Sequence, residues 1–298
     1  MRLNHNMASL NIYMTHKRAL ESQSSALNKI STGYKVNNAK DDPNAIAQSE
    51  RTRIQIRGLQ MAGRNTQDGV SMLQTAEGGL DSITQMLQRI RELVVQSGSG
   101  SSTDDDRKIM QNEINQMVEG IGNVVDCTEF NGKSLLNNTK LNEGTVSDDG
   151  EFVELDMPVG ANAGESVKIP IYDLSPGELK VKNGALAGKS LKDVNIESGG
   201  KSIDDALSIL DNAIDKTISV RSKYGALENR FEDTMDNVSE ISNRMEGADS
   251  NLRDADIAEE MMKFSRDNIL LEAGNAMMAQ TNKFPQDVLR ILENLKSR

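Results

Sequence analysis

The sequence has few of the residues that build a thick core, a disulfide framework or an imidazole metal site. Its 298 residues include no Trp, 3% aromatic residues, two histidines (His5 and His16) and one cysteine, Cys127. One cysteine excludes an internal disulfide and a multi-cysteine zinc site, and we expect Cys127 to be a small buried apolar residue. Too few histidines remain for a metal site, and the sequence contains no His-Glu-x-x-His stretch.

Long apolar runs are also missing. No stretch approaches the 18 apolar residues of a membrane span, and the first ten residues lack the unbroken apolar run of a secretory signal. We therefore expect no membrane association, and a protein that stays in the cytosol or leaves the cell without a cleaved signal peptide.

The charge is unevenly distributed. Residues 1–64 hold ten Lys and Arg against four Asp and Glu, a balance of +6, which leaves −17 for the rest of a chain whose net charge is −11. The basic residues are spaced singly, without the cluster that a phosphate-tracking groove needs, so nucleic acid is not an expected partner. The acidic run 104–106 lacks the spaced ligands of a calcium loop and suits a helix start, and no Gly-rich phosphate loop follows a strand. The sequence predicts no enzyme and no cofactor.

The five prolines stand at 43, 158, 170, 176 and 285, which permits long helices between them. A coiled-coil seam with 3-4 spacing follows Pro43 and resumes after the break at 97–103, with Thr103 as the expected N-cap. A third seam begins after Ser202, the expected N-cap of a helix of some 45 residues, and polar residues interrupt it at four positions. The three seams are Leu73, Ala76, Leu80, Ile83, Leu87, Ile90 and Val94; Met110, Ile114, Met117, Ile121 and Val124; and Ile203, Leu207, Leu210, Ile214, Tyr224, Phe231, Met235, Val238 and Met245, interrupted by Arg221, Glu228, Ser242 and Asp249.

The middle of the chain has a different texture. Asn131-Gly132 is a turn signal, and residues 151–172 combine β-branched residues, partial alternation and Gly-rich breaks, so they predict a hairpin or small sheet. Residues 173–200 are expected to be rich in loops.

Both ends predict amphipathic helices with more apolar surface than one partner would cover. Asn, Lys and Asp fill a polar joint at 35–42, with Asp42 as the expected N-cap and Pro43 at the first helical position. The apolar stripes comprise residues 3, 7, 10 and 14; 13, 20, 27, 30 and 34; 257, 261, 264, 271 and 278; and a narrow small-residue line at 269, 273 and 276.

Several motifs, in order along nearly the whole chain, resemble those of bacterial flagellin. They are "SSALNKISTGYKVNNAKDDPNAIA", "GLQMAGRNTQDGVSMLQTAEGGLDSITQMLQRIRELVVQS", "TEFNGKSLL", "VGANAGES" and "DADIAEEMMKFSRDNILLEAGNAMMAQTNKFPQDVL". The resemblance implies a mainly α fold, a long antiparallel helical coiled-coil bundle built from both chain ends with a small β-hairpin element in the middle. It implies an inner terminal-helix domain (1–42 and 253–298), an outer helical domain (43–172 and 201–252) and a short variable region (173–200).

The resemblance also implies a function, namely self-polymerisation into the flagellar filament for swimming motility, with terminal helices that fold on assembly. The partners it implies are other copies of the chain, the flagellar export apparatus and export chaperone, and the filament cap and hook-junction proteins. The expected filament-core residues are Leu3, Leu10, Leu20, Leu27, Ile30, Ile257, Met261, Phe264, Leu271 and Met278.

In the family, a leucine-rich-repeat Toll-like receptor of animal hosts recognises the outer helices. The matching residues here are Arg89, Leu93 and Glu113, although Met117 stands where an arginine is frequent. The same residues would equally serve as contacts between subunits.

Two features depart from the family pattern. Residues 173–200 leave space for almost no variable outer domain, and the carboxyl end runs on through "RILENLKSR". Two alternatives remain open at this point. A hook–filament junction adaptor would share the terminal helices without forming long filaments unaided, and a cytosolic coiled-coil binding module would be a folded dimer with protease-resistant ends.

Overall fold

The computed structural model describes residues 7–138, 145–146, 152–181, 186, 188–196 and 201–296. The chain divides into two compact units. The terminal unit comprises residues 1–54 and 243–298, and the central unit comprises residues 55–242. The division falls inside helices α2 (Pro43–Ser97) and α4 (Lys201–Arg253), farther along the chain than the polar joint at 35–42.

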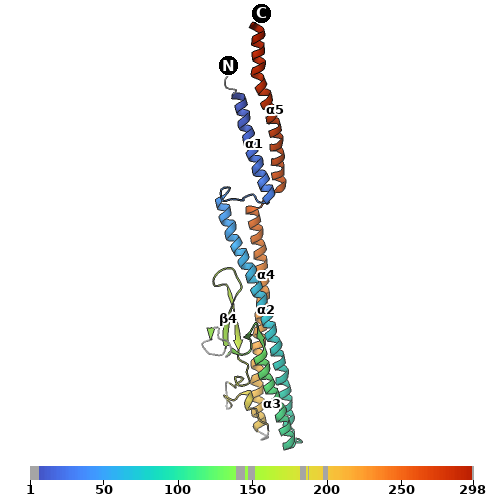
Figure 1. Cartoon of the computed structure of the whole chain (residues 1–298). Coiled ribbons are helices and arrows are strands. Elements are labelled where there is room, and N and C mark those ends of the chain that lie inside the picture. The colour runs from blue at the N-terminus through green and yellow to red at the C-terminus, as the bar shows by residue number, and fades with distance from the viewer. Residues whose placement is uncertain are drawn as a thin grey trace. The chain divides into compact units, whose positions relative to one another are not determined.

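The core of the central unit is built around the first seam that the sequence predicts, the one in α2. In α2, Leu80, Ile83, Leu87 and Ile90 are completely buried, and they share one hydrophobic cluster with residues of α3 (Asp104–Cys127) and α4. The three helices run side by side (Figure 1). A period of 3.5 residues places every seam position on one face, so the polar residues between them stay on the outside.

Two predicted helix starts are confirmed and one is wrong. The Thr103 hydroxyl accepts a hydrogen bond from the Asp106 amide, and the Asp106 carboxylate accepts one from the Thr103 amide. The two hydrogen bonds form a capping box. Asp42 Oδ1 accepts two amides of the first turn of α2, each at 3.0 Å. Helix α4 begins at Lys201 and spans 53 residues, so Ser202 lies inside the helix, where its hydroxyl donates to the Asn195 carbonyl.

The β structure follows the predicted turns. Strands β1 (Glu129–Phe130) and β2 (Lys133–Ser134) flank Asn131 and Gly132, whose φ values of 50° and 77° fit a type I′ turn. Strand β4 (Phe152–Pro158) pairs antiparallel with β5 (Ser166–Tyr172), which confirms the hairpin. A short strand not predicted from the sequence, β3 (Thr145–Val146), pairs with the other side of β4.

Two glycines of α2 leave space for the loops of these strands to pack against the helix. A Cβ on Gly58 would lie 2.9 Å from Ala161 Cβ in the β4–β5 turn, and Asn65 donates from the same helix to the Pro158 carbonyl at 3.2 Å. A Cβ on Gly79 would lie 2.9 Å from a Leu136 methyl after β2. The glycines therefore set how closely the β segments approach α2.

Residues 173–181 and 188–196 contribute to the core. Leu174, Leu179, Leu191 and Ile196 are buried in the same cluster as the helical seam, around the 3₁₀ turn η2 (Leu191–Asp193). Gln111 of α3 holds this segment by donating to the Val194 carbonyl at 3.0 Å and accepting the Ile196 amide at 2.9 Å. One prediction for α3 is wrong, because Cys127 is exposed at its last turn instead of buried.

The terminal unit pairs the two ends of the chain. Helix α1 (Met7–Thr32) lies alongside α5 (Ile257–Lys296) (Figure 1). The Ser9 hydroxyl donates a hydrogen bond to Asn282, and the Gln23 amide donates one to Asn268. Residue numbers therefore rise along α1 while they fall along α5, so the two helices are antiparallel.

Candidate assembly surface on the terminal helices

The side that α1 and α5 share is made mostly of small and polar residues. His16 of α1 faces Gly274 of α5, where an added Cβ would lie 3.5 Å from the imidazole ring. The buried and half-buried residues recur with 3-4 spacing on both helices, as in an antiparallel coiled coil. They include Ile12, His16, Ala19, Gln23, Ala26 and Ile30 of α1, and Glu260, Phe264, Asp267, Leu271, Gly274 and Met278 of α5.

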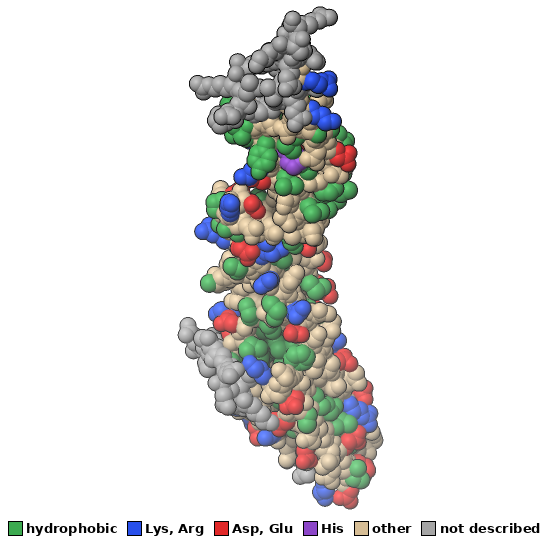
Figure 2. Space-filling view, turned by 45° about the horizontal axis from the view of Figure 1, so that its top comes forward, with side chains coloured by type: hydrophobic (Ala, Val, Ile, Leu, Met, Phe, Trp, Pro, Cys, Tyr) green, Lys and Arg blue, Asp and Glu red, His purple; other side chains and the backbone are tan. Residues whose placement is uncertain are grey.

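Large apolar side chains cover the outer faces of the same helices. Twelve of them are between 43% and 70% exposed. Hydrophobic side chains are accordingly visible at the surface in the upper part of Figure 2. Exposed large apolar side chains concentrated on two helices indicate an interaction site. The twelve are Met7, Leu10, Tyr13, Met14, Leu20, Leu27, Ile257, Met261, Met262, Ile269, Leu270 and Met277.

The structure separates the expected filament-core residues into two groups. Leu10, Leu20, Leu27, Ile257 and Met261 are exposed. The pairing of α1 with α5 uses the others: Leu271 is buried, and Ile30, Phe264 and Met278 are half-buried. Leu3 lies outside the described residues.

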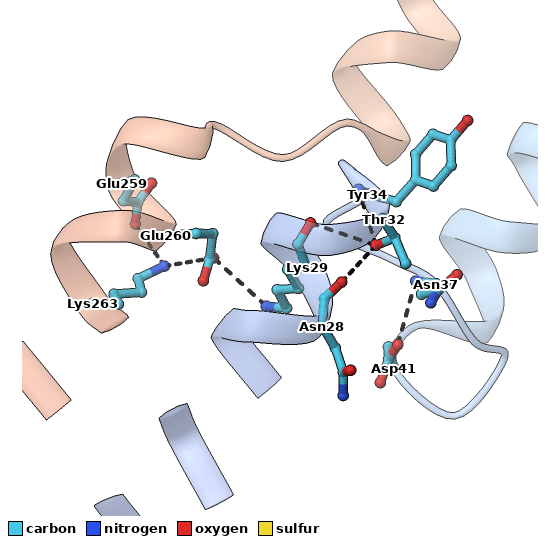
Figure 3. Close-up of polar contacts among 9 residues, drawn as sticks. All are labelled: Asn28, Lys29, Thr32, Tyr34, Asn37, Asp41, Glu259, Glu260 and Lys263. Atoms are coloured by element: carbon cyan, nitrogen blue, oxygen red, sulfur yellow. Dashed lines mark hydrogen bonds and ion pairs between the residues drawn. The ribbon is translucent and has the colours of Figure 1, made fainter. Parts of the chain in front are cut away.

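A charged cluster joins the end of α1 to the start of α5. The buried carboxylate of Glu260 lies 3.7 Å from Lys29 Nζ of α1 and 3.0 Å from Lys263 Nζ of its own helix (Figure 3). Lys263 also contacts Glu259 at 2.8 Å, and the two carboxylates, Glu259 foremost, raise the pKa of the Lys263 ammonium. The buried acid thus has cationic partners on both helices.

The two joints of the terminal unit are hydrogen-bonded to each other. Gly33 ends α1 with φ 74°, its carbonyl accepts the Ala255 amide at 2.9 Å, and the Lys35 amide donates to the Arg253 carbonyl at 2.7 Å. The Arg253 guanidinium lies 4.8 Å from the centre of the Tyr34 ring. The polar joint following α1 is therefore held against the joint between α4 and α5.

The polar residues that interrupt the third seam link α4 to α2. Asp249 is buried and accepts from the Ser49 hydroxyl at 2.5 Å and from Arg53 Nε at 3.1 Å. Hydrogen bonds to Asp249, and then to Tyr34, raise the pKa of Arg53. In the central unit, Arg221 pairs with Glu77 and Asp81, and Glu228 accepts a hydrogen bond from Gln74. The sequence predicts the polar interruptions of the seam, but it does not predict these partners on α2.

One buried carboxylate weakens the α1–α5 pair. Asp267 is 2% exposed, and its Oδ2 has no hydrogen-bond partner among the described residues, while Oδ1 lies 3.5 Å from Arg266. A buried acceptor without a donor costs about 1 to 3 kcal/mol. The seam between α1 and α5 therefore contains one buried acceptor that no described donor satisfies.

The expected receptor residues have different surroundings. Arg89 is exposed and bridges Glu92 of α2 at 3.0 Å and Glu113 of α3 at 3.1 Å. These hydrogen bonds, the one to Glu92 foremost, raise the pKa of Arg89. The Leu93 side chain is 2% exposed and lies in the core of the central unit. Receptor contact through these three residues stays a prediction.

The described residues contain no group of three or more His, Cys, Asp and Glu side chains placed to hold a metal ion. Over the same part of the chain, no helix combines the length and apolarity that crossing a bilayer requires. The main surface feature left to explain is therefore the exposed apolar face of the terminal helices.

Comparison with known proteins assigns the same two ends. The bacterial flagellin N-terminal helical region matches residues 3–141, and the bacterial flagellin C-terminal helical region matches residues 207–292. A flagellin of Bacillus subtilis (strain 168) is 38% identical over 306 residues, covering 98% of this chain and 100% of the relative. The chain belongs to the bacterial flagellin family.

Other relatives are similar over the same length. A flagellar filament 33 kDa core protein of Treponema phagedenis is 35% identical over 98% of this flagellin and 100% of the relative. A structure described as that of a flagellar hook-associated protein of Vibrio parahaemolyticus aligns with a TM-score of 0.59 at 19% identity, over 72% of this chain and 100% of the other. That similarity concerns the fold alone.

Proposed function

We propose that this flagellin is a structural subunit that self-polymerises into the bacterial flagellar filament used for swimming, with terminal helices that fold on assembly. The observation that carries the proposal is the distribution of apolar residues on α1 and α5. Their shared side is mostly small and polar, with Leu271 as the one large apolar residue that is buried among the described side chains of the two helices, whereas their outer faces hold twelve exposed large apolar side chains. Such faces are stabilised when other copies cover them.

The energetics favour coupling between folding and assembly. Ordering a residue costs about 1 to 2 kcal/mol in backbone entropy, and a fully buried large apolar side chain returns about 1.5 to 3 kcal/mol. Among the described residues of α1, only Ala19 and Ala26 are buried, so one chain gains little from pairing its ends. Neighbouring subunits would supply the missing burial, and a repeated contact that does not close into a ring generates a helical filament.

The remaining partners follow from this role. As a filament subunit, the chain would leave the cell through the flagellar export apparatus without a cleaved signal peptide, escorted by an export chaperone. It would add beneath the filament cap and meet the hook-junction proteins at the base of an extracellular filament. The role is structural and requires neither a catalytic residue nor a cofactor.

Receptor recognition is a second proposal for the outer helices. The exposed Arg89 and the half-buried Glu113 form one interhelical ion pair, which a Toll-like receptor of an animal host would meet at the surface. Leu93 would act only by holding this surface in place from below. A reporter-cell assay of receptor signalling tests this proposal. We expect Glu113→Ala to lose signalling and the control Glu119→Ala, at an exposed position of the same helix, to retain it.

Seeded polymerisation tests the filament proposal. Purified full-length protein is mixed with short filament fragments, next to a variant lacking residues 1–34, and both are followed by negative-stain electron microscopy. We expect long filaments from the full chain and none from the truncated chain. Circular dichroism of the truncated chain checks that its remaining helices are folded.

Two results would contradict the filament proposal. Full-length protein that binds the seed tips without elongating them would favour a hook–filament junction adaptor. Filaments formed equally well by the truncated chain would show that the terminal helices do not drive assembly.

A further inference from the structure

A basic stripe lies on the outer face of α2 in the central unit. Arg57 and Arg64 are exposed, seven residues apart, with the 53% exposed Met61 between them. Arg64 Nη1 lies 4.0 Å from Met61 Sδ, and neither arginine has a carboxylate within 4.0 Å among the described residues. The stripe combines two cations with the solvent-exposed apolar side chain of Met61.

An acidic stripe lies on the outer face of α4. Between Arg230 and Arg244 the helix carries four acids and no base, and all four are exposed. Asp233 and Glu240 are seven residues apart, like the two arginines of α2, with Asp236 between them. At 1.5 Å per residue, the outer members of each stripe are separated by about 10.5 Å along their helices.

The two stripes face away from each other within one chain. On α2, the buried Leu59 and Ala62 alternate with the exposed arginines, and on α4 the buried Phe231 and Val238 alternate with the exposed acids. A Cβ on Gly69 of α2 would lie 3.3 Å from the Phe231 ring, so the buried sides are the ones that meet. The stripes occupy opposite outer sides of the α2–α4 pair and are out of reach of each other in one copy.

We infer that the basic stripe of one flagellin copy docks on the acidic stripe of the next copy in the filament. Complementary charges on opposite sides form a heterologous contact, which builds a filament when its rotation does not close into a ring. The helices α2 and α4 are antiparallel within the chain, as shown by the pairs Gly69–Phe231 and Gln74–Glu228. When neighbouring copies have the same orientation in the filament, α2 of one copy therefore meets α4 of the next copy in the antiparallel sense.

The antiparallel sense also matches the spacing of the stripes. Reading α2 forward, Arg57, Met61 and Arg64 are separated by four and then three residues. Reading α4 backward, Glu240, Asp236 and Asp233 are separated by four and then three residues. Arg57 can therefore lie opposite Glu240 while Arg64 lies opposite Asp233.

This inference rests on the proposed filament function, and charge reversal tests it separately. We compare the wild-type chain, R57E/R64E, D233R/E240R and the chain with all four substitutions in seeded polymerisation at low ionic strength. The critical concentration is measured by sedimentation. Because like charges across an interface are strongly unfavourable, each double variant is expected to raise the critical concentration about tenfold or more. The fourfold variant restores opposite charges and is expected to polymerise close to the wild-type level.

A mixture provides a second readout of the same contact. R57E/R64E presents acid on both sides and D233R/E240R presents base on both sides. An equimolar mixture is therefore expected to polymerise where each variant alone does not, and the defects of the single variants are expected to shrink as salt screens them. The control K108E/K180E changes the net charge as much as R57E/R64E at exposed lysines elsewhere on the central unit and is expected to polymerise like the wild type.

Each other outcome overturns the inference. Wild-type polymerisation by R57E/R64E would show that the stripe is not a contact. Failure of both the fourfold variant and the mixture, with all chains folded by circular dichroism, would show that the two stripes do not face each other. A defect in K108E/K180E of equal size would assign the effect to net charge. A wild-type chain that fails to polymerise on seeds would instead contradict the filament function itself.

Discussion

At the scale of single residues, polar side chains within the helical core act as links between elements. Gln111 lies inside an otherwise apolar cluster and satisfies one carbonyl and one amide of the segment at 194–196. Asp249 does the same for a hydroxyl and a guanidinium of α2. The periodicity of the sequence marks the polar interruptions of the α4 seam, but their partners are about 140 to 200 residues away, and no local pattern identifies them.

Gln111→Ala is expected to lower the free energy of unfolding of the monomer by about 2 to 3 kcal/mol. The change leaves two buried backbone groups without partners. Urea denaturation followed by circular dichroism measures the loss. Gln88→Ala, at an exposed position of α2, should change stability by less than about 0.5 kcal/mol. Equal stability of the two variants would contradict the linking role of Gln111.

The capping box of α3 makes a prediction about pH. Hydrogen bonds from the Thr103 hydroxyl and amide lower the pKa of Asp106 below its usual value of 3.8. A carboxylate with a lowered pKa in the folded state stabilises the fold above its unfolded pKa, and this stabilisation is lost as the pH falls through the folded pKa. The first turn of α3 should therefore fray below about pH 4.

The pKa of Asp106, followed by carbon NMR of its carboxyl group, is expected to rise in Thr103→Ala. The same measurement on Ser101→Ala, which leaves the capping box intact, serves as the control. An unchanged Asp106 pKa in Thr103→Ala would rule out the capping hydrogen bonds as the cause of the shift.

At the scale of elements, local chemistry correctly predicts two of the three helix starts that it addresses and both hairpins, and tertiary contacts explain the errors. Pro43 after Asp42, and Thr103 before three acids, place the starts of α2 and α3 correctly. Ser202 is an equally good local signal, yet α4 starts before it. The segments 173–181 and 188–196 look like loops because their apolar residues have no regular period. Only the assembled core shows that side chains such as Leu174 and Leu191 are buried. The flagellin resemblance implies Leu93 as a receptor contact, although its side chain lies on the seam side of α2.

Two adjacent glycines of α2 test how the β segments dock on the helix. An added Cβ on Gly79 would lie 2.8 Å from the Thr128 hydroxyl and 2.9 Å from a Leu136 methyl, whereas on Gly78 it would meet nothing within 4 Å. Gly79→Ala is expected to lower the free energy of unfolding by about 1 to 3 kcal/mol through overpacking. Gly78→Ala is expected to raise it by about 0.5 to 1 kcal/mol, because alanine loses less backbone entropy. Thermal unfolding of the two variants measures both changes. Equal shifts of the melting temperature would contradict close packing of the β segments at Gly79.

At the scale of the whole molecule, each compact unit has its own distribution of apolar surface. The central unit encloses a continuous cluster of buried residues, as a stable folded body does. The terminal unit pairs α1 with α5 mostly through small and polar residues and keeps twelve large apolar side chains exposed on its outer faces. The sequence predicts the excess of apolar surface at both ends, but it does not predict which stripe faces the partner helix, because both stripes have suitable periods.

Hydrogen–deuterium exchange of residues 7–32, compared between the free subunit and the filament, tests the central claim most directly. If the terminal helices fold on assembly, these amides exchange rapidly in the free subunit and slowly in the filament. The amides of α2 at 73–94 serve as an internal reference and exchange slowly in both states, because they belong to the buried seam of the central unit. Slow exchange of residues 7–32 in the free subunit would contradict the claim, since α1 and α5 would then form a stable pair without their neighbours.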